Sequence, residues 1–191
     1  MQRIRTILSL ILSLAVLPLM AQSNSPGKNL EVAYFAQFLI QPGLSISSSI
    51  DVQSLTATGQ ASTRSLFLRP QVGYYFQSNS HQSYLAALDF GYSIQKRKKR
   101  GWAYQSVSFG MGYQLKSTQE GFSVSLADGS RSSQKWVNTT GWLPTVSYTQ
   151  GIPIQPQLSG YYRILVGQLF ENTERSSATL FTEIGLRYYL K

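Results

Sequence analysis

The chain has 191 residues, a length that suits a single domain. Only 13% of its residues are charged, against roughly 25% in soluble proteins. The chain also contains 12 tyrosines. The absence of cysteine excludes disulfides, thiolate metal sites and a lipid anchor on a mature N-terminal cysteine. A low fraction of charged residues with many tyrosines favours a membrane barrel over a cytosolic enzyme. The few charged residues are mostly basic, so the formal net charge is +9.

The first 21 residues have the pattern of a secretory signal peptide. Arg3 and Arg5 form a basic start, residues 7–17 form an apolar core, and Ala21 precedes a plausible cleavage point. The alternative is an uncleaved membrane anchor, but the apolar core is too short for a spanning helix. No later stretch approaches the roughly 20 apolar residues that a membrane helix needs. We therefore expect an exported mature domain over 22–191 that can enter a membrane only as a barrel.

The mature chain begins with two short alternating segments. Apolar and polar residues alternate over 30–41 and again over 44–52, which is the period of β-strands. Pro42 and Gly43 between them predict a turn. The alternative is one bent strand over 30–52, because proline is also tolerated at a strand edge or bulge. A Ser/Thr-rich loop is expected over 54–65.

The clearest alternation lies in a predicted hairpin over 66–95, turning at 78–80. Even-numbered residues of both arms are uncharged and mostly apolar, whereas the odd-numbered face carries Arg69 and Asp89. Each arm is about 11 residues long, which matches the length of a tilted strand that crosses a bilayer. The pattern predicts that the first face meets lipid and the second faces the inside of a barrel.

Four further strands complete the prediction. They are expected over 103–115, 136–148, 161–170 and 180–190. Their connections are expected to be a basic turn over 96–100, a long loop over 116–135, a short turn over 151–157 and a polar loop over 171–177. Single-chain bacterial barrels have an even number of strands, and eight strands enclose a space that side chains can fill. The predicted fold is all-β: an eight-stranded antiparallel up-and-down transmembrane β-barrel with a filled polar interior.

The same alternation predicts which charges lie inside the barrel. An unpaired charge in so enclosed a space would be costly, so acids and bases should form a network. The predicted members are Glu31, Asp51, Arg69, Asp89, Arg163, Glu183 and Arg187.

Many aromatic residues fall on the outward positions, several near strand ends. This is the expected appearance of aromatic girdles at two membrane interfaces, although tyrosine is also simply a good strand residue. The residues are Tyr34, Tyr74, Tyr92, Tyr113, Trp136, Trp142, Tyr148, Tyr162 and Tyr188.

Five consecutive basic residues form the predicted turn between two strands. They are Lys96, Arg97, Lys98, Lys99 and Arg100. Near anionic headgroups or lipopolysaccharide phosphates each such residue gains about 1 kcal/mol, whereas the alternative is a merely soluble turn. Nucleic acid is not an expected partner of an exported chain. If both termini are periplasmic, eight strands place this turn on the periplasmic side and the 116–135 loop outside.

The signal peptide, the alternating strands and the apolar-aromatic last strand resemble the small outer-membrane barrels of the OmpA/OmpX type. The Gln41-Pro42-Gly43 segment, residues 66–70, the basic turn and residues 183–190 also resemble short uncharacterised Bacteroidota outer-membrane proteins. The resemblance implies a Gram-negative outer membrane as location and the barrel assembly machinery as a biogenesis partner. It implies a structural or surface-interaction role without an open pore. The final Lys191 departs from the aromatic end that such barrels usually have.

One short motif suggests an enzyme instead. His81 is the only histidine, and with Ser83 it resembles the His-x-Ser pair of lipid A 3-O-deacylase barrels, in which histidine activates a serine nucleophile. The surrounding family motif is absent and the next glutamate, Glu120, falls in another loop, so a polar hairpin turn is the preferred interpretation. No metal site or cofactor is expected. A soluble periplasmic barrel with a small hydrophobic ligand is a further alternative, disfavoured because the inward positions are polar.

Overall fold

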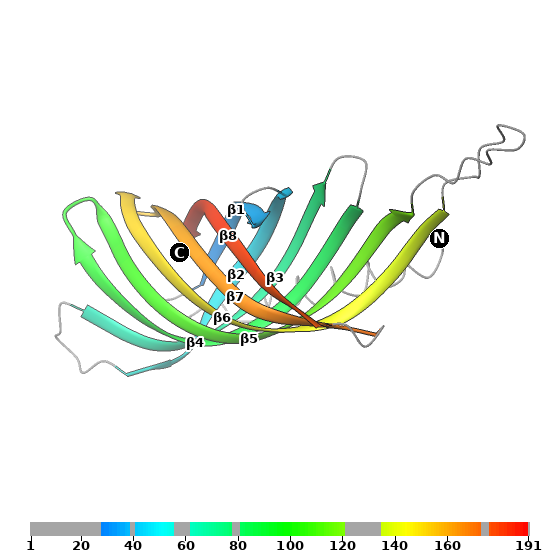
Figure 1. Cartoon of the computed structure of the whole chain (residues 1–191). Helices are drawn as coiled ribbons and strands as arrows, with labels where there is room; N and C mark the ends of the chain where they lie inside the picture. Colours follow the sequence, from blue (N-terminus) through cyan, green and yellow to red (C-terminus); the bar gives the residue numbers. More distant parts are fainter. Residues whose placement is uncertain are drawn as a thin grey trace, which may run out of the picture.

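The computed structural model describes residues 28–38, 41–55, 62–77, 81–120, 135–172 and 176–190. These residues form eight antiparallel strands in chain order, and β1 pairs with β8 to close the barrel (Figure 1). The strands are β1 (Asn29–Gln37), β2 (Gln41–Ser54), β3 (Ser62–Gln77), β4 (His81–Lys98), β5 (Gly101–Glu120), β6 (Lys135–Gln155), β7 (Leu158–Glu171) and β8 (Ser176–Tyr189). The fold predicted from alternation is confirmed.

The barrel has two distinct ends. We call the end at which β1 begins and β8 finishes the termini end; it also carries the β4–β5 and β6–β7 turns, at the left of Figure 1. The opposite end, where β5 finishes and β6 begins, is called the loop end. Within the described residues, no helix has the length and apolar character needed to cross a membrane. The expected signal peptide, the 78–80 turn and residues 121–134 lie outside the described residues.

The first hairpin differs from its prediction. β1 and β2 are separate strands, so the single bent strand is wrong, but Pro42 and Gly43 lie inside β2 and not in a turn. The chain leaves β1 at Phe38, which has a positive φ of 50°. Pro42 precedes the first residue of β2 that pairs with β3, so its missing N–H interrupts no hydrogen-bonded ladder on that side.

Most strands are longer than predicted. β5 continues to Glu120 and β6 starts at Lys135, so strand occupies both ends of the predicted 116–135 loop. β3 begins at Ser62, within the predicted 54–65 loop, and β6 continues to Gln155, within the predicted 151–157 turn. The extensions of β3 and β5 are rich in polar residues, so a search for apolar alternation does not detect them, whereas backbone pairing with a neighbouring strand continues regardless of side-chain polarity. The extension of β6 contains Gly151 and Pro153, which are typical turn residues, and its pairing with β7 continues past them with a shift of register.

The interior contains an apolar layer as well as the expected polar one. A cluster of buried inward side chains lies toward the loop end: Phe35, Tyr75, Leu85, Leu143, Leu165, Leu169 and Phe181. The rings of Phe35 and Phe181 stack with centroids 4.9 Å apart, and Tyr75 meets Phe35 edge-on at 5.8 Å. The rule that apolar side chains point outward is therefore incomplete, because a filled barrel needs well-packed side chains inside and not only polar ones.

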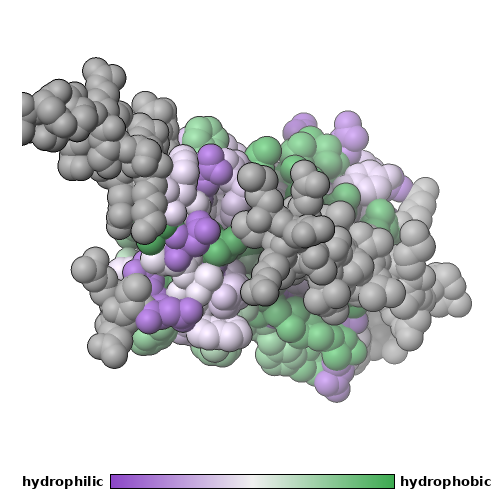
Figure 2. All heavy atoms as spheres, turned by 90° about the vertical axis from the view of Figure 1, so that its right-hand side faces the viewer, coloured by the Kyte–Doolittle hydropathy of each residue, from purple (hydrophilic) through white to green (hydrophobic). Residues whose placement is uncertain are grey.

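The outer surface is apolar around the ring. Large hydrophobic side chains are about half exposed in the middle of the strands, for example Ile46 at 50%, Phe109 at 60% and Val146 at 54%. Figure 2 shows hydrophobic side chains in green patches beside purple hydrophilic ones. Of the nine aromatic residues assigned to the outer face from the sequence, all but Tyr74 and Tyr92 are among the exposed large hydrophobics. A monomer in water rarely leaves so much apolar surface uncovered.

One inward glycine is expected to be intolerant of substitution. A Cβ at Gly151 would lie 2.0 Å from Cε1 of Tyr104, whose buried ring is held by Arg187 above it at 3.5 Å. Replacing Gly151 with alanine should therefore lower the free energy of unfolding by about 1–3 kcal/mol, measured by urea denaturation in detergent. Gly160→Ala is the control, because the nearest atom to its Cβ is Cδ1 of Ile154 at 3.4 Å. Equal stability of the two variants would contradict this packing.

Candidate functional site

An ion cluster of four residues lies inside the barrel where the first and last strands meet. The register places Glu31 of β1 opposite Arg187 of β8, and Arg163 of β7 opposite Glu183 of β8. Arg163 is fully buried and bridges both acids: its Nη1 donates to Glu183 Oε2 at 2.5 Å, and its Nη2 donates to Glu31 Oε2. Its Nε donates to Thr149 Oγ1 at 3.0 Å. This one guanidinium group thus links its own strand, β7, to β1, β6 and β8.

Neutral polar side chains complete the hydrogen bonding of the two acids. Glu31 accepts hydrogen bonds from Ser47 at 2.9 Å and Ser49 at 3.1 Å, in addition to its ion pair with Arg187. Glu183 accepts from Ser45 Oγ at 3.2 Å and from the side-chain amide of Gln71. Buried charges are tolerated only when they are paired and hydrogen-bonded, and both acids meet that condition here.

A second, separate ion pair lies on the opposite wall. Arg69 of β3 and Asp89 of β4 are direct cross-strand partners, and the Arg69 Nε donates to Asp89 Oδ2 at 3.1 Å. The Arg69 Nη2 also donates to Ser108 at 3.1 Å and to Ser147 at 3.2 Å. Both charged side chains are almost completely buried.

The seven charges assigned to the interior from the sequence therefore separate into three groups. Four form the cluster, two form the Arg69–Asp89 pair, and Asp51 is partly exposed and accepts a hydrogen bond from Ser65 Oγ at 2.9 Å. The serines, Gln71 and Tyr104 also contact these charges, but they were not predicted as site residues. They could have been found, because they occupy inward positions of the same alternation.

The buried charges of this arrangement are paired with one another. Every charge of the cluster and of the separate pair has a charged partner, and no described group of three or more His, Asp or Glu residues is placed to hold a metal ion. The apolar layer lies between these charges and the loop end. Eight strands enclose a space just wide enough for side chains to fill, and these charged side chains occupy part of it.

The structure buries the His81 and Ser83 side chains inside the barrel wall. His81 Nε2 lies 2.9 Å from Gln41 Oε1, and its ring meets Tyr75 edge-on. Ser83 is 0% exposed, and its Oγ accepts a hydrogen bond from Gln114 Nε2 at 3.4 Å. A serine nucleophile must reach its substrate and be contacted by its base, and this buried hydroxyl faces an amide and a tyrosine.

Alanine at both positions is expected to leave lipid A unchanged. Cells that carry His81→Ala with Ser83→Ala should give the same lipid A mass spectrum as cells that carry the wild-type chain, because neither group faces a substrate. A matched strain without the chain is the control. A wild-type spectrum with fewer acyl chains than the double variant would restore the deacylase hypothesis.

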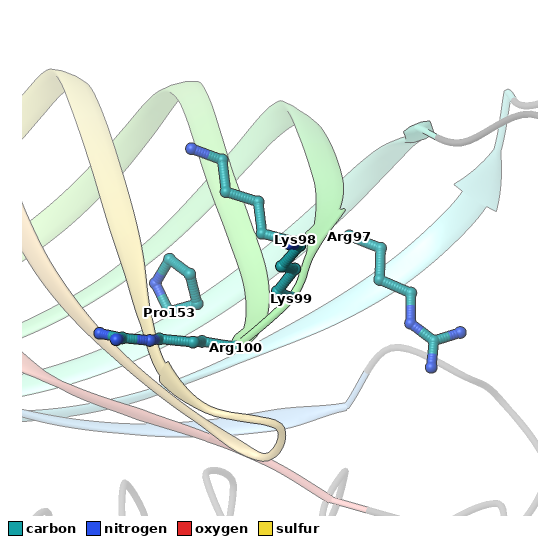
Figure 3. Close-up of a pocket in the computed structure, with 5 residues that line it drawn as sticks. All are labelled: Arg97, Lys98, Lys99, Arg100 and Pro153. Atoms are coloured by element: carbon teal, nitrogen blue, oxygen red, sulfur yellow. The ribbon is translucent and has the colours of Figure 1, made fainter.

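The basic turn lies at the termini end, where Lys98 of β4 pairs with Gly101 of β5 around Lys99 and Arg100. All five basic side chains, Lys96 to Arg100, are exposed. Gly101 has a φ of +137°, and a Cβ there would lie 2.4 Å from the Gln155 carbonyl oxygen, so the turn requires glycine at this position. Figure 3 shows a shallow depression with Arg100 extending alongside Pro153 of β6, while Arg97 points away from Lys98.

No protein-family model and no curated protein sequence matches the chain. Among solved structures it is similar to the N-terminal β-barrel domain of Pseudomonas aeruginosa OprF, with 13% identity over 87% of this chain and 100% of that chain and a TM-score of 0.50. It is also similar to Neisserial surface protein A (16% identity, 85% and 94% covered, TM-score 0.39) and to the attachment invasion locus protein Ail of Yersinia pestis (8%, 86% and 99%, 0.37). At 13% identity the likeness to the OprF domain shows the fold alone, that of a small outer-membrane β-barrel.

Proposed function

We propose that the chain is an integral outer-membrane β-barrel protein that has a structural or surface-interaction role and forms no open pore. The single observation that carries this proposal is the sorting of side chains across a closed ring. Exposed apolar residues cover the outside, and the ion cluster and apolar layer fill the inside. A sheet can lie in lipid only if it is closed, because unpaired backbone groups are costly there.

The packed interior supports the absence of a pore. A channel requires a continuous water-filled path, but Arg69 and Arg163 extend into the interior and are 0% exposed. The stacked rings of Phe35 and Phe181 occupy the next layer toward the loop end. Eight strands enclose too little space to hold these side chains and a channel as well.

The β5–β6 hairpin supports a role at the cell surface. Its residues Leu115–Glu120 pair with Lys135–Thr140, whereas β7 first pairs with β6 at Gly141. The β6 arm of the hairpin therefore extends beyond β7 at the loop end, at the right of Figure 1, whereas the β5 arm stays paired with β4 up to Thr118. Trp136, which lies on this extension, is 48% exposed. With the termini end toward the periplasm, the extension would face the medium.

Two measurements test the proposal. We expect the chain in the outer-membrane fraction of a Gram-negative host, and we expect its gel mobility to change on heating because a closed barrel resists detergent until it is boiled. In planar bilayers it should give no steady conductance, with an open porin as the positive control. Recovery in the soluble fraction would overturn the location, and a stable single-channel current would overturn the closed interior.

A further inference from the structure

We propose that the barrel opens along two opposed seams, β2–β3 and β6–β7, and that the two four-stranded halves between them move apart as units. A seam is a boundary between neighbouring strands at which the backbone ladder is interrupted. The long half consists of β3 to β6, and the short half consists of β7, β8, β1 and β2. The proposal concerns the closed ring itself, so it applies in detergent as well as in a bilayer.

Pro144 interrupts the ladder of the β6–β7 seam. The two strands pair in one register on both sides of this proline, but Pro144 itself has no partner on β7. On its other side Pro144 still pairs with Met111 of β5. The missing N–H of the proline therefore faces β7, and the carbonyl of Gln168, which the register places opposite, loses its ladder donor.

Pro70 interrupts the β2–β3 seam in the same way. It pairs with Leu88 of β4 but has no partner on β2, where the register places Ser48 opposite it. Direct cross-strand partners connect the two prolines across the long half, in the order Pro70, Leu88, Met111 and Pro144. The long half is thus bounded at one level by a missing donor on each of its edges.

Each seam has a second interruption near the termini end. The register shifts between Asp51 and Gln53 in the β2–β3 seam, and between Pro153 and Gln155 in the β6–β7 seam. The other six ladders of the described residues are continuous. A proline inside a sheet is normally confined to an edge or a bulge, and a closed barrel has no edge. Two weak lines on opposite sides of a ring let each half move without bending its own ladders.

The ion pairs of the interior follow the same division. The Arg69–Asp89 pair lies wholly in the long half, and the four-residue ion cluster lies wholly in the short half. Hydrogen bonds between the halves have a neutral partner, such as Arg163 Nε to Thr149 Oγ1 at 3.0 Å and Ser65 Oγ to Asp51 Oδ1 at 2.9 Å. Separation of the halves therefore leaves none of these buried charges without its charged partner, which would be the costly event.

The apolar layer holds the two halves together. Phe35 and Phe181 of the short half meet the ring of Tyr75 of the long half edge-on, with centroids 5.8 and 5.7 Å apart. Packing of this kind is not directional and forms again when the halves return. The halves are thus joined by reversible contacts, while each is internally joined by continuous ladders and ion pairs.

Amide hydrogen exchange, followed by NMR on the purified full barrel in detergent micelles, tests the seams. Val146 pairs with Val166 across the β6–β7 seam, and Leu88 pairs with Met111 inside the long half. The two valine amides should exchange faster than the Leu88 and Met111 amides, because an opening seam exposes them without global unfolding.

Replacing the proline tests the cause of the interruption. Pro144→Ala restores a donor opposite Gln168, so exchange of the Val146 amide should slow by about fivefold. Pro42→Ala is the matched control, because Pro42 lies at the start of β2, outside the pairs that join β2 to β3. It should leave exchange at Val146 unchanged.

A covalent link tests whether the halves move as units, and the chain has no native cysteine. Val146→Cys with Val166→Cys places a disulfide across a seam, whereas Leu88→Cys with Met111→Cys places one inside the long half. The two links close chain segments of similar length, so they constrain the unfolded chain about equally. Only the first link also hinders separation of the halves. Relative to its reduced form, it should therefore raise the urea midpoint of unfolding more than the second.

Three outcomes would overturn the proposal. They are equal exchange at the seam and control amides, no slowing at Val146 in Pro144→Ala, and equal midpoint shifts from the two disulfides. Heat-modifiable migration verifies beforehand that each variant has folded. Because these measurements need no bilayer, a chain that fails to enter vesicles contradicts the proposed function and leaves this inference intact.

Discussion

Replacing Arg163 with methionine is expected to lower the free energy of unfolding by about 3–5 kcal/mol, because a buried ion pair that loses one partner leaves an uncompensated charge. Arg163 is fully buried and forms ion pairs with both Glu31 and Glu183. Without it, Glu31 keeps Arg187, but Glu183 keeps only the neutral donors Ser45 and Gln71. Urea denaturation of the reconstituted barrel, followed by tryptophan fluorescence, measures the loss.

A double variant separates the charge effect from lost packing. Arg163→Met with Glu183→Gln removes both members of one ion pair, and the amide can still accept the hydrogen bond from Ser45. It should recover part of the stability lost by Arg163→Met alone, since no carboxylate is left unpaired. If the double variant is as unstable as the sum of its single variants, the cluster does not couple the two residues.

Replacing Val146 with arginine is expected to cost about 2–4 kcal/mol in a bilayer, because an arginine on the lipid face is most unfavourable at the membrane midplane. Val146 is 54% exposed on the outer face of β6, and it lies between the outward aromatic residues Trp142 and Tyr148. On a barrel in water, the same substitution at so exposed a position should cost little.

The matched control lies on the neighbouring strand. Gln105 is an exposed outward residue of β5 near the termini end, and Gln105→Arg should cost no more than about 1 kcal/mol at an interface. Unfolding from vesicles of both variants gives the comparison. If Val146→Arg and Gln105→Arg lower the free energy of unfolding equally, the apolar outer surface does not face lipid.

The sequence was enough to predict which residues of a strand point into the barrel, but not which charged residues pair with one another. Alternation places Arg163 and Glu183 on inward positions, because neighbouring residues of a strand face opposite sides. It does not reveal that Glu31 lies opposite Arg187, since this depends on the register between the first and last strands. Asp51 also lies on an inward position, but it is near the termini end of the barrel and is partly exposed.

The errors at strand ends have a different physical origin. Pro42-Gly43 is a common turn sequence, yet a proline is accommodated at a strand end where no donor is required. The polar stretch 116–120 remains strand because backbone hydrogen bonds to an adjacent strand do not depend on side-chain polarity. Residues 151–155 remain strand although Gly151 and Pro153 are typical turn residues, and the register shifts between Pro153 and Gln155. The apolar layer around Phe35 was missed, although inward residues such as Phe35 and Tyr75 interrupt the alternation with continuous apolar or aromatic runs at 32–36 and 74–76.

The residues that join β1 to β8 have a consequence for biogenesis. Glu31 is made near the start of the chain, but Glu183 and Arg187, two of its cluster partners, belong to the last strand to leave the ribosome. Until that strand arrives, Glu31 lacks Arg187, one of its two arginine partners, and one edge of β1 has no strand to pair with. Lipid cannot satisfy the backbone groups of such an edge. Strand-by-strand entry into the bilayer is therefore unfavourable for this chain, and truncation before Ser176 should prevent insertion altogether.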